Sequence, residues 1–350
     1  MAWRTPHAVS TYHVIGVRRE GAAVKVVGLE EHYVTAEVVK AWADLDPRWQ
    51  DPAVNRPGQD GIRRQLLEIG DQRLAAMNEA GVDLQVASLT SPGLFNLAAA
   101  DARALQTDCN DQLADAVRAH PDRLQGFATL AAPDPDAAAD ELRRAVTTLG
   151  FNGALIFSRV RDQPIDDRDF WPIFEAAEEL GAPLYLHPQT PPPSVREAYY
   201  AGFDDVISGA FATHGVGWHY DAGVQLLRLI LAGVFDRFPD LRVIMGHWGE
   251  TVLFFLDRID RITGIAHLER RVSEYVRSNV FVTPGGVFST RYLRWALEVV
   301  GADRIMFAAD YPFVSPDDGA ARHFLEALDD GDREKIASGN WDRLCAAIRR

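Results

Sequence analysis

The chain has 350 residues and a formal net charge of −14, with 47% hydrophobic and 25% charged residues. This is an ordinary globular composition with enough apolar material for a large core. The acidic balance argues against nucleic acid or an anionic membrane as a partner, because both require clustered Lys and Arg.

The chain shows no sign of export, membrane insertion or disulfide bonding. No apolar run approaches the roughly 20 residues of a membrane span, and the first 20 residues lack the apolar core of a signal peptide. Cys109 and Cys345 are the only cysteines, and their spacing matches neither a disulfide framework nor a zinc knuckle. We predict a cytoplasmic, soluble enzyme with two buried or partly buried thiols.

Short apolar runs alternate with amphipathic segments from Lys25 almost to the end of the chain. In chain order the predicted strands are Val24–Leu29, Leu84–Leu89, Leu124–Leu130, Gly153–Phe157, Pro183–Leu186, Leu241–Met245, Val280–Thr283 and Arg304–Phe307. Eight strand-helix units in about 325 residues predict an α/β protein with a (β/α)8 TIM-type barrel, because open doubly wound sheets more often have five or six strands.

The barrel is predicted to form one domain, residues 25–350, after an N-terminal arm, residues 1–24. No internal repeat or Pro/Gly/Ser linker divides the chain. Three irregular segments are expected to form the active-site loops: Asp46–Gly61, Gln189–Gly215 and Tyr311–Gly319.

Four of the predicted strands are followed by unusual polar residues, and the carboxyl ends of barrel strands converge on one mouth. These residues are Glu30, Glu31 and His32 after the first strand, His187 after the fifth, His247 and Glu250 after the sixth, and Asp310 after the eighth. Period-two alternation sends Glu30 and His32 to the same side and Glu31 to the other.

A single histidine in such a place is more often a hydrogen-bonded core or rim residue than a ligand. Two carboxylates and two or three imidazoles at one mouth would be costly unless a cation or tight hydrogen bonding offset them. We therefore predict one divalent metal ion bound by Glu30, His32, His187 and Asp310. Oxygen and imidazole ligands without a thiolate suit Zn²⁺ or Mn²⁺ and do not distinguish them.

The sequence resembles the amidohydrolase superfamily, in particular its decarboxylase branch. The motifs that carry the resemblance are Glu30-x-His32, Leu186-His187-Pro188, Gly246-His247-x-Gly249-Glu250 and Ala309-Asp310-Tyr311-Pro312-Phe313. Residues 25–344 look like γ-resorcylate, 2,3-dihydroxybenzoate and 5-carboxyvanillate decarboxylases. Glu30 is the most specific feature, because many amidohydrolases have His-x-His on the first strand and the hydroxybenzoate group has Glu-x-His.

The resemblance implies a single metal held by the same four residues, with His247 among the catalytic residues, and a homodimer or homotetramer. It also implies a small aromatic acid substrate, which binds the metal through a carboxylate and an ortho hydroxyl. Direct loss of carbon dioxide would leave an aryl carbanion, so protonation of the ring carbon is expected to come first. Asp310 is the preferred proton donor.

Beside His247, the residues Glu250, Arg258 and Phe313 are assigned to the site as hypotheses. His247 and Glu250 are three residues apart and are expected to share one helix face as a proton-sharing pair; the alternative is that Glu250 only favours the helix start. Arg258 would balance Glu250 or meet a substrate carboxylate, or else form a surface ion pair. Phe313 would stack on the substrate ring, or else pack within its loop. His219 is interpreted as a structural or supporting residue.

Two rival functions remain open at this point. A metal-dependent hydrolase or hydratase of the same superfamily, acting on a lactone, amide, ester or enol acid, would use the same ligands. A non-catalytic barrel would usually lack a ligand, and all four are present. The segments Tyr33–Lys40 and Arg48–Arg64 match no single decarboxylase, so the substrate is not identified by sequence.

Overall fold

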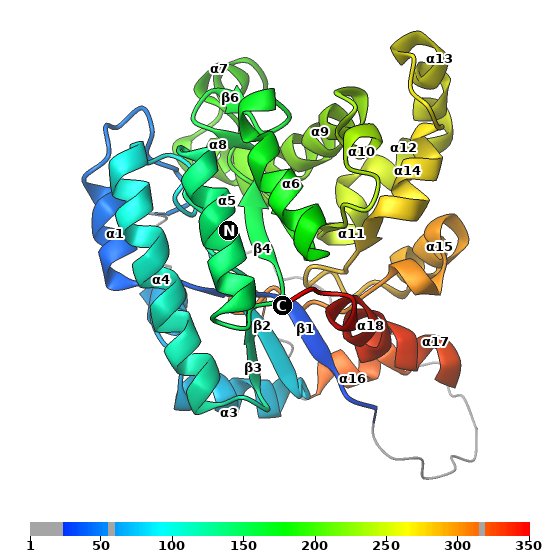
Figure 1. Cartoon of the computed structure of the whole chain (residues 1–350), viewed down its shortest axis with the longest axis horizontal. Helices are drawn as coiled ribbons and strands as arrows, with labels where there is room; N and C mark the ends of the chain where they lie inside the picture. The colour runs from blue at the N-terminus through cyan, green and yellow to red at the C-terminus, as the bar shows by residue number, and fades with distance from the viewer. Residues whose placement is uncertain (1–23, 55–59, 315–318) are drawn as a thin grey trace, which may run out of the picture.

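The computed structural model of the protein describes residues 24–54, 60–314 and 319–350. Parallel strands form its centre and helices cover the outside (Figure 1). The parallel strands are β1 (Val27–Tyr33), β2 (Leu84–Leu89), β3 (Leu124–Gly126), β4 (Ala154–Phe157), β7 (Leu184–His187), β8 (Val243–Met245) and β9 (Val280–Val282). A short antiparallel hairpin that was not predicted, β5 (Arg159–Val160) and β6 (Gln163–Pro164), follows β4.

The strands close into a ring. One sheet has the order β1-β2-β3 and another has the order β4-β7-β8-β9. Isolated parallel bridges join them, Ala128 with Ala154 on one side and, on the other, Val282 with Ile305 and Glu31 with Tyr311. The predicted (β/α)8 barrel is confirmed, and residues 305–311 occupy its eighth position.

Several predicted strands differ from the structure in their bounds; the third, predicted as Leu124–Leu130, ends at Gly126. Arg304–Phe307 is not a regular strand, because it makes only the bridge at Ile305 and begins in the single turn η5 (Ala302–Arg304). A side chain replaces part of the missing ladder: Glu31 Oε1 accepts the backbone N–H of Ala309 at 2.9 Å. The first strand is Val27–Tyr33 rather than Val24–Leu29, so its polar motif lies inside the strand.

Helices fill the connections between strands. The helices are α1 (Ala36–Ala43), α2 (Asp60–Leu66), α3 (Asp71–Ala80), α4 (Ala99–Ala119), α5 (Pro135–Thr147), η1 (Arg168–Phe170), α6 (Trp171–Leu180), α9 (Gly217–Leu231), α10 (Val234–Arg237), α11 (His247–Glu250), α12 (Val252–Ile259), η4 (Asp260–Ile262), α13 (Thr263–Ala266), α14 (Val272–Asn279), α15 (Thr290–Val300), α16 (Ala320–Leu325), α17 (Asp330–Glu334), η6 (Lys335–Gly339) and α18 (Asn340–Ala346). Local chemistry sets their ends: the Asp134 side chain caps α5, and Gly181, with φ of +64°, ends α6.

The predicted loop Gln189–Gly215 is largely helical, which corrects the sequence prediction. It contains α7 (Pro193–Val195), η2 (Arg196–Tyr200), α8 (Asp205–Ala210) and η3 (Phe211–Gly215). A cap favours this outcome, since the Asp204 side chain accepts the N–H of Ile207 at the start of α8. The predicted arm, up to residue 23, and parts of the other two loops lie outside the described residues.

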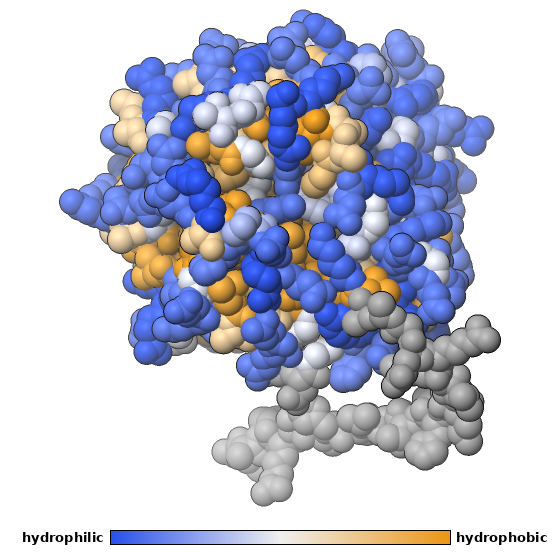
Figure 2. All heavy atoms as spheres, turned by 60° about the horizontal axis from the view of Figure 1, so that its bottom comes forward, coloured by the Kyte–Doolittle hydropathy of each residue, from blue (hydrophilic) through white to orange (hydrophobic). Residues whose placement is uncertain are grey.

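Figure 2 shows one face on which hydrophilic side chains predominate, with small apolar areas between them. No helix in the described ranges is both long enough and apolar enough to cross a membrane. Cys109 is buried and Cys345 is partly buried, as predicted.

Candidate metal centre

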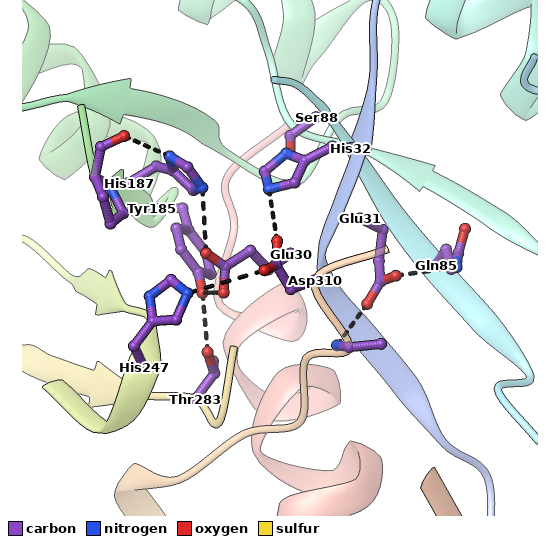
Figure 3. A network of polar contacts seen from close by, with 12 residues as sticks. Glu30, Glu31, His32, Gln85, Ser88, Tyr185, His187, His247, Thr283 and Asp310 are labelled. Carbon is purple, nitrogen blue, oxygen red and sulfur yellow. Dashed lines mark hydrogen bonds and ion pairs between the residues drawn. The ribbon is translucent and has the colours of Figure 1, made fainter. Parts of the chain in front are cut away.

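The four predicted ligands meet inside the barrel. Glu30 and His32 lie on β1, His187 ends β7, and Asp310 lies in the eighth segment. Each offers one ligand atom, and these atoms all lie within 4.8 Å of one another. His187 Nε2 is 3.3 Å from Glu30 Oε1, and His32 Nε2 is 3.4 Å from Asp310 Oδ1 (Figure 3).

Strand alternation separates Glu31 from this group, as predicted. Figure 3 shows its carboxylate on the opposite side of β1, turned toward Gln85. Gln85 Nε2 donates to Glu31 Oε2 at 3.0 Å, while the other oxygen accepts from Ala309. Glu31 therefore supports the barrel wall and is no ligand.

Neighbouring polar groups orient the ligands. His187 Nδ1 lies 2.7 Å from the Pro188 carbonyl and donates to it, which leaves Nε2 as a lone-pair donor facing the centre. Tyr185 Oη donates to Glu30 Oε2 at 2.6 Å and lies 2.9 Å from Thr283 Oγ1. Tyr185 was not singled out in the sequence, although it stands two residues before His187 and so faces the same side.

The charge state of these residues fits a divalent cation. Burial lowers the pKa of His32 to about 4 and the pKa of His187 well below its usual value, so both imidazoles are neutral. Within the described part of the chain, Glu30 Oε1 and His32 Nε2 are buried and have no hydrogen-bond partner. Unpaired buried acceptors are costly. A cation coordinated by Glu30, His32, His187 and Asp310 would satisfy them.

Asp310 combines a strained backbone with an unusual acidity. Its φ is +64°, a conformation that aspartate tolerates better than most residues. Burial raises the pKa of the Asp310 carboxyl to about 7, against the opposing effect of His247 and His219. His247 Nε2 lies 4.0 Å from Asp310 Oδ2, so a proton donor and an imidazole face the same space.

His247 and Glu250 form the predicted pair, but through a strained turn rather than a regular helix face. The backbone of α11 has positive φ at His247, Trp248, Gly249 and Glu250. His247 Nδ1 lies 2.6 Å from Glu250 Oε1. Burial alone would lower the pKa of His247, but Glu250 and Glu30 raise it to about 10. Burial would raise the pKa of Glu250, but the two neighbouring imidazoles lower it.

His219, on α9, holds the other oxygen of Glu250. Its Nδ1 is 2.8 Å from Glu250 Oε2, and its Nε2 is 3.1 Å from the His214 carbonyl. Both ring nitrogens therefore face acceptors, and both bonds form only when each nitrogen carries a hydrogen. The sequence gives no sign of this contact, because α9 and α11 lie far apart along the chain.

The two predicted substrate-binding residues are placed differently. The Phe313 ring lies at the mouth, 5.7 Å from the ring of His32 between centroids. Arg258 is exposed on α12, while His247 and His219 engage the Glu250 carboxylate. The structure thus brings Phe313 to the centre and does not pair Arg258 with Glu250. Arg258 as a contact for a substrate carboxylate stays a prediction.

Glycines allow the backbone to approach Glu30 closely. A Cβ at Gly285, where φ is +50°, would lie 2.9 Å from Glu30 Oε2 and 2.8 Å from the backbone nitrogen of His247. A Cβ at Gly246 would also lie 2.9 Å from Glu30 Oε2. Larger residues would displace the ligand.

Fold and ligand set together define a (β/α)8 barrel with a mononuclear metal site. The chain belongs to the amidohydrolase family, with a match over residues 35–344. The γ-resorcylate decarboxylase of Polaromonas sp. (strain JS666 / ATCC BAA-500) is 34% identical over 334 residues, which cover 91% of this chain and 97% of that protein.

Solved structures show the same relationship. The 5-carboxyvanillate decarboxylase LigW from Sphingomonas paucimobilis superposes with a TM-score of 0.85 at 32% identity, covering 93% of this chain and 100% of that one. A dihydroxybenzoic acid decarboxylase from Polaromonas sp. JS666, solved with manganese and the inhibitor 2-nitroresorcinol, gives a TM-score of 0.81 at 31% identity, covering 93% and 98%. The predicted resemblance to the decarboxylase branch is confirmed.

Proposed function

We propose that this chain is a metal-dependent carboxy-lyase that removes the carboxylate of an aromatic acid bearing an ortho hydroxyl, without oxidation. The observation that carries the proposal is Asp310, a partly buried carboxyl with a raised pKa within a ligand set of Glu30, His32 and His187. When it is not coordinated to the metal, such a group can hold a proton near neutral pH and deliver it to a substrate in the same space.

The residues support a two-step reaction. Asp310 gives its proton to the ring carbon that bears the carboxylate, which avoids an aryl carbanion. The bond from that carbon to the carboxylate then breaks, its electron pair restores the aromatic ring, and carbon dioxide leaves. Asp310 regains a proton from solvent, with His247 Nε2 4.0 Å away as the nearest imidazole on that side.

The divalent cation, when bound, would supply Lewis-acid attraction for the substrate oxygens. His247 is held as an imidazolium by Glu250 and offsets the negative charge of Glu30, and that of Asp310 once Asp310 has transferred its proton. The positive charge of the His247 imidazolium also favours an anionic substrate at the mouth. Phe313 would pack against the aromatic ring, and Arg258 is proposed as a further carboxylate contact.

We further propose manganese or zinc as the metal, a cytoplasmic location, and a homodimer or homotetramer. Exposed aromatic residues on α12 support self-association, since Phe254 is 72% and Phe255 48% exposed. Light scattering on the purified chain measures the oligomeric state, and a monomer would contradict this part of the proposal.

Elemental mass spectrometry of the purified protein, with an ultraviolet screen of ortho-hydroxybenzoic acids, tests the function. Stoichiometric zinc or manganese and the release of carbon dioxide from such an acid would support it. Metal without any decarboxylation would favour a hydrolase or hydratase. Asp310→Asn should reduce turnover by about 10²- to 10⁴-fold; near-full activity in that variant would refute its role as proton donor.

A further inference from the structure

Four arginines gather in one pocket at the barrel mouth, in a chain whose net charge is −14. Arg48, Arg159, Arg161 and Arg196 line it, and its free volume is about 280 Å³, including its opening to solvent. The described metal centre uses none of the four.

The elements around the metal centre also build this pocket. The β5–β6 hairpin, which directly follows β4, carries Arg159 and leads into Arg161. Arg196 begins η2 immediately after α7, and the labels β6 and α7 lie next to each other at the top of Figure 1. Phe157 pairs with His187 across β4 and β7, and their rings are 5.7 Å apart. Arg159 and Thr190, which line the pocket, follow Phe157 and His187 by two and three residues, so the pocket lies next to the wall of the metal centre.

Two of the guanidinium groups have buried donors to spare. Arg159, whose side chain is 11% exposed, donates to the Thr190 carbonyl and lies 3.7 Å from Asp221 Oδ2. Its Nε is nevertheless buried without a partner among the described residues, and so is Nε of Arg196. Buried donors of this kind normally find an acceptor. No main-chain or side-chain oxygen of the described ranges provides one.

The other two arginines, Arg48 and Arg161, line the pocket beside Trp49. The guanidinium carbons of Arg48 and Arg161 lie 4.6 and 5.3 Å from the Trp49 ring centroid. Arg161 Nε donates to the Asn96 carbonyl at 3.3 Å, and Arg48 is paired with Asp162 on the outer side. These contacts hold the two guanidinium groups in place.

Three carboxylates lie near the pocket, and two of them, Asp162 and Asp221, face arginines of the pocket. Asp51 Oδ1 accepts both the Thr190 hydroxyl at 2.5 Å and the Ala53 N–H at 2.8 Å. The Ser158 hydroxyl donates to Asp221, and Asp162 faces Arg48. Four guanidinium groups thus meet three carboxylates, so the pocket keeps an excess of positive charge and unused donors.

We propose that this arginine pocket binds an oxyanion through Arg159, Arg161 and Arg196. Guanidinium groups present planar pairs of donors that match carboxylate, phosphate and sulfate oxygens. The oxyanion is either a second anionic group on a substrate held at the metal or a free inorganic anion. The binding claim is independent of the reaction catalysed at the metal.

Inorganic sulfate is a suitable probe, titrated calorimetrically into the metal-loaded protein at constant ionic strength with chloride as the balancing anion. We expect saturable binding by the wild type and at least a tenfold higher Kd for Arg196→Gln and for Arg161→Gln. Arg196→Gln is the main variant, because Arg159 is tied to Asp221 and its loss would disturb the fold. Arg237→Gln, an exposed arginine of α10, is the matched control and should bind sulfate as the wild type does.

Absence of saturable binding up to tens of millimolar sulfate would overturn the proposal. Equal binding by wild type and both pocket variants would also overturn it, because the sulfate would then lie elsewhere. Steady-state kinetics then distinguish the two sources of the oxyanion. The substrates to compare are ortho-hydroxybenzoic acids that carry a second carboxylate and those that lack it. If sulfate and Arg196→Gln raise KM only for the dicarboxylate, the site holds a substrate group; if neither KM changes, it holds a free anion.

Discussion

The carboxylate of Glu250 controls the charge of His247 from a fully buried position between two imidazoles. In Glu250→Gln the pKa of His247 should fall from about 10, because burial then acts with less opposing charge. At pH 8 a larger fraction of the imidazole would therefore be neutral in the variant than in the wild type. Proton NMR titration of the imidazole measures this shift.

Turnover of Glu250→Gln should fall about 10²-fold or more while metal content is retained. Glu269→Gln, which replaces an exposed glutamate in the same way, provides the control. An unchanged pKa of His247 in Glu250→Gln would contradict the proposed electrostatic coupling.

Both cysteines should be unreactive in the native protein. Burial raises the pKa of the Cys109 thiol and of the Cys345 thiol to about 12, so almost no thiolate exists at pH 8. Labelling with a disulfide reagent should be slow and its rate should still be rising with pH at pH 9, whereas the unfolded chain should react at once. Rapid native labelling of either thiol would show that its environment is not as described.

Strand β1 carries metal ligands on one side and a supporting carboxyl on the other. Glu31 is linked to Gln85, which accepts from Arg73 Nη1 at 3.1 Å, and Arg73 also donates to the His32 carbonyl. This buried network fastens β1 to α3 and to the eighth segment. Glu31→Ala should lower the free energy of unfolding by about 3 kcal/mol, measured by urea denaturation with exposed Glu37→Gln as the control.

Glu31→Gln should lower the free energy of unfolding far less than Glu31→Ala does. Its comparison with the wild type should show in which direction stability changes with pH. Burial raises the pKa of Glu31 from 4.5 to about 8, so the folded protein keeps a proton that the unfolded chain releases between these values. The stabilisation is fully present below pH 4.5 and is lost as the pH rises through 8. The wild type should therefore lose stability relative to Glu31→Gln between pH 6 and pH 8.5, and a constant difference would be inconsistent with a raised pKa.

Local patterns predicted the elements that carry the ligands. Glu30, His32 and His187 follow apolar runs whose period-two alternation fixes the side on which each lies. The same alternation did not predict the irregular backbone of the eighth segment. There the Glu31 side chain, rather than backbone hydrogen bonds between strands, holds Ala309 in place. The helices within 189–215 were missed for a related reason, since a single cap at Asp204 decides the start of α8 in a segment of weak periodicity.

Contacts between distant segments were beyond the reach of sequence patterns. His219 meets Glu250 only because α9 packs against α11, and the four arginines converge only once the β5–β6 hairpin has formed. The ligand set was accessible because one barrel mouth collects every strand end. Its supporting side chains depend on how the loops fold over that mouth.

Metal binding should stabilise the whole molecule, because it neutralises buried charge at the meeting point of β1, β7 and the eighth segment. Metal at 100 times its Kd should add about 2.7 kcal/mol to the free energy of unfolding. Chelation should lower Tm, and added Mn²⁺ or Zn²⁺ should restore it. In His187→Ala this metal-dependent shift should shrink strongly; a full shift in that variant would rule out His187 as a ligand.

The most direct test of the central claim is turnover of an accepted ortho-hydroxybenzoic acid in D₂O, with the product analysed by NMR and mass spectrometry. Ring protonation followed by loss of carbon dioxide predicts a phenol with one deuterium on the carbon that carried the carboxylate. A product that retains the carboxylate and has gained the elements of water would contradict the account and identify a hydrolase or hydratase instead.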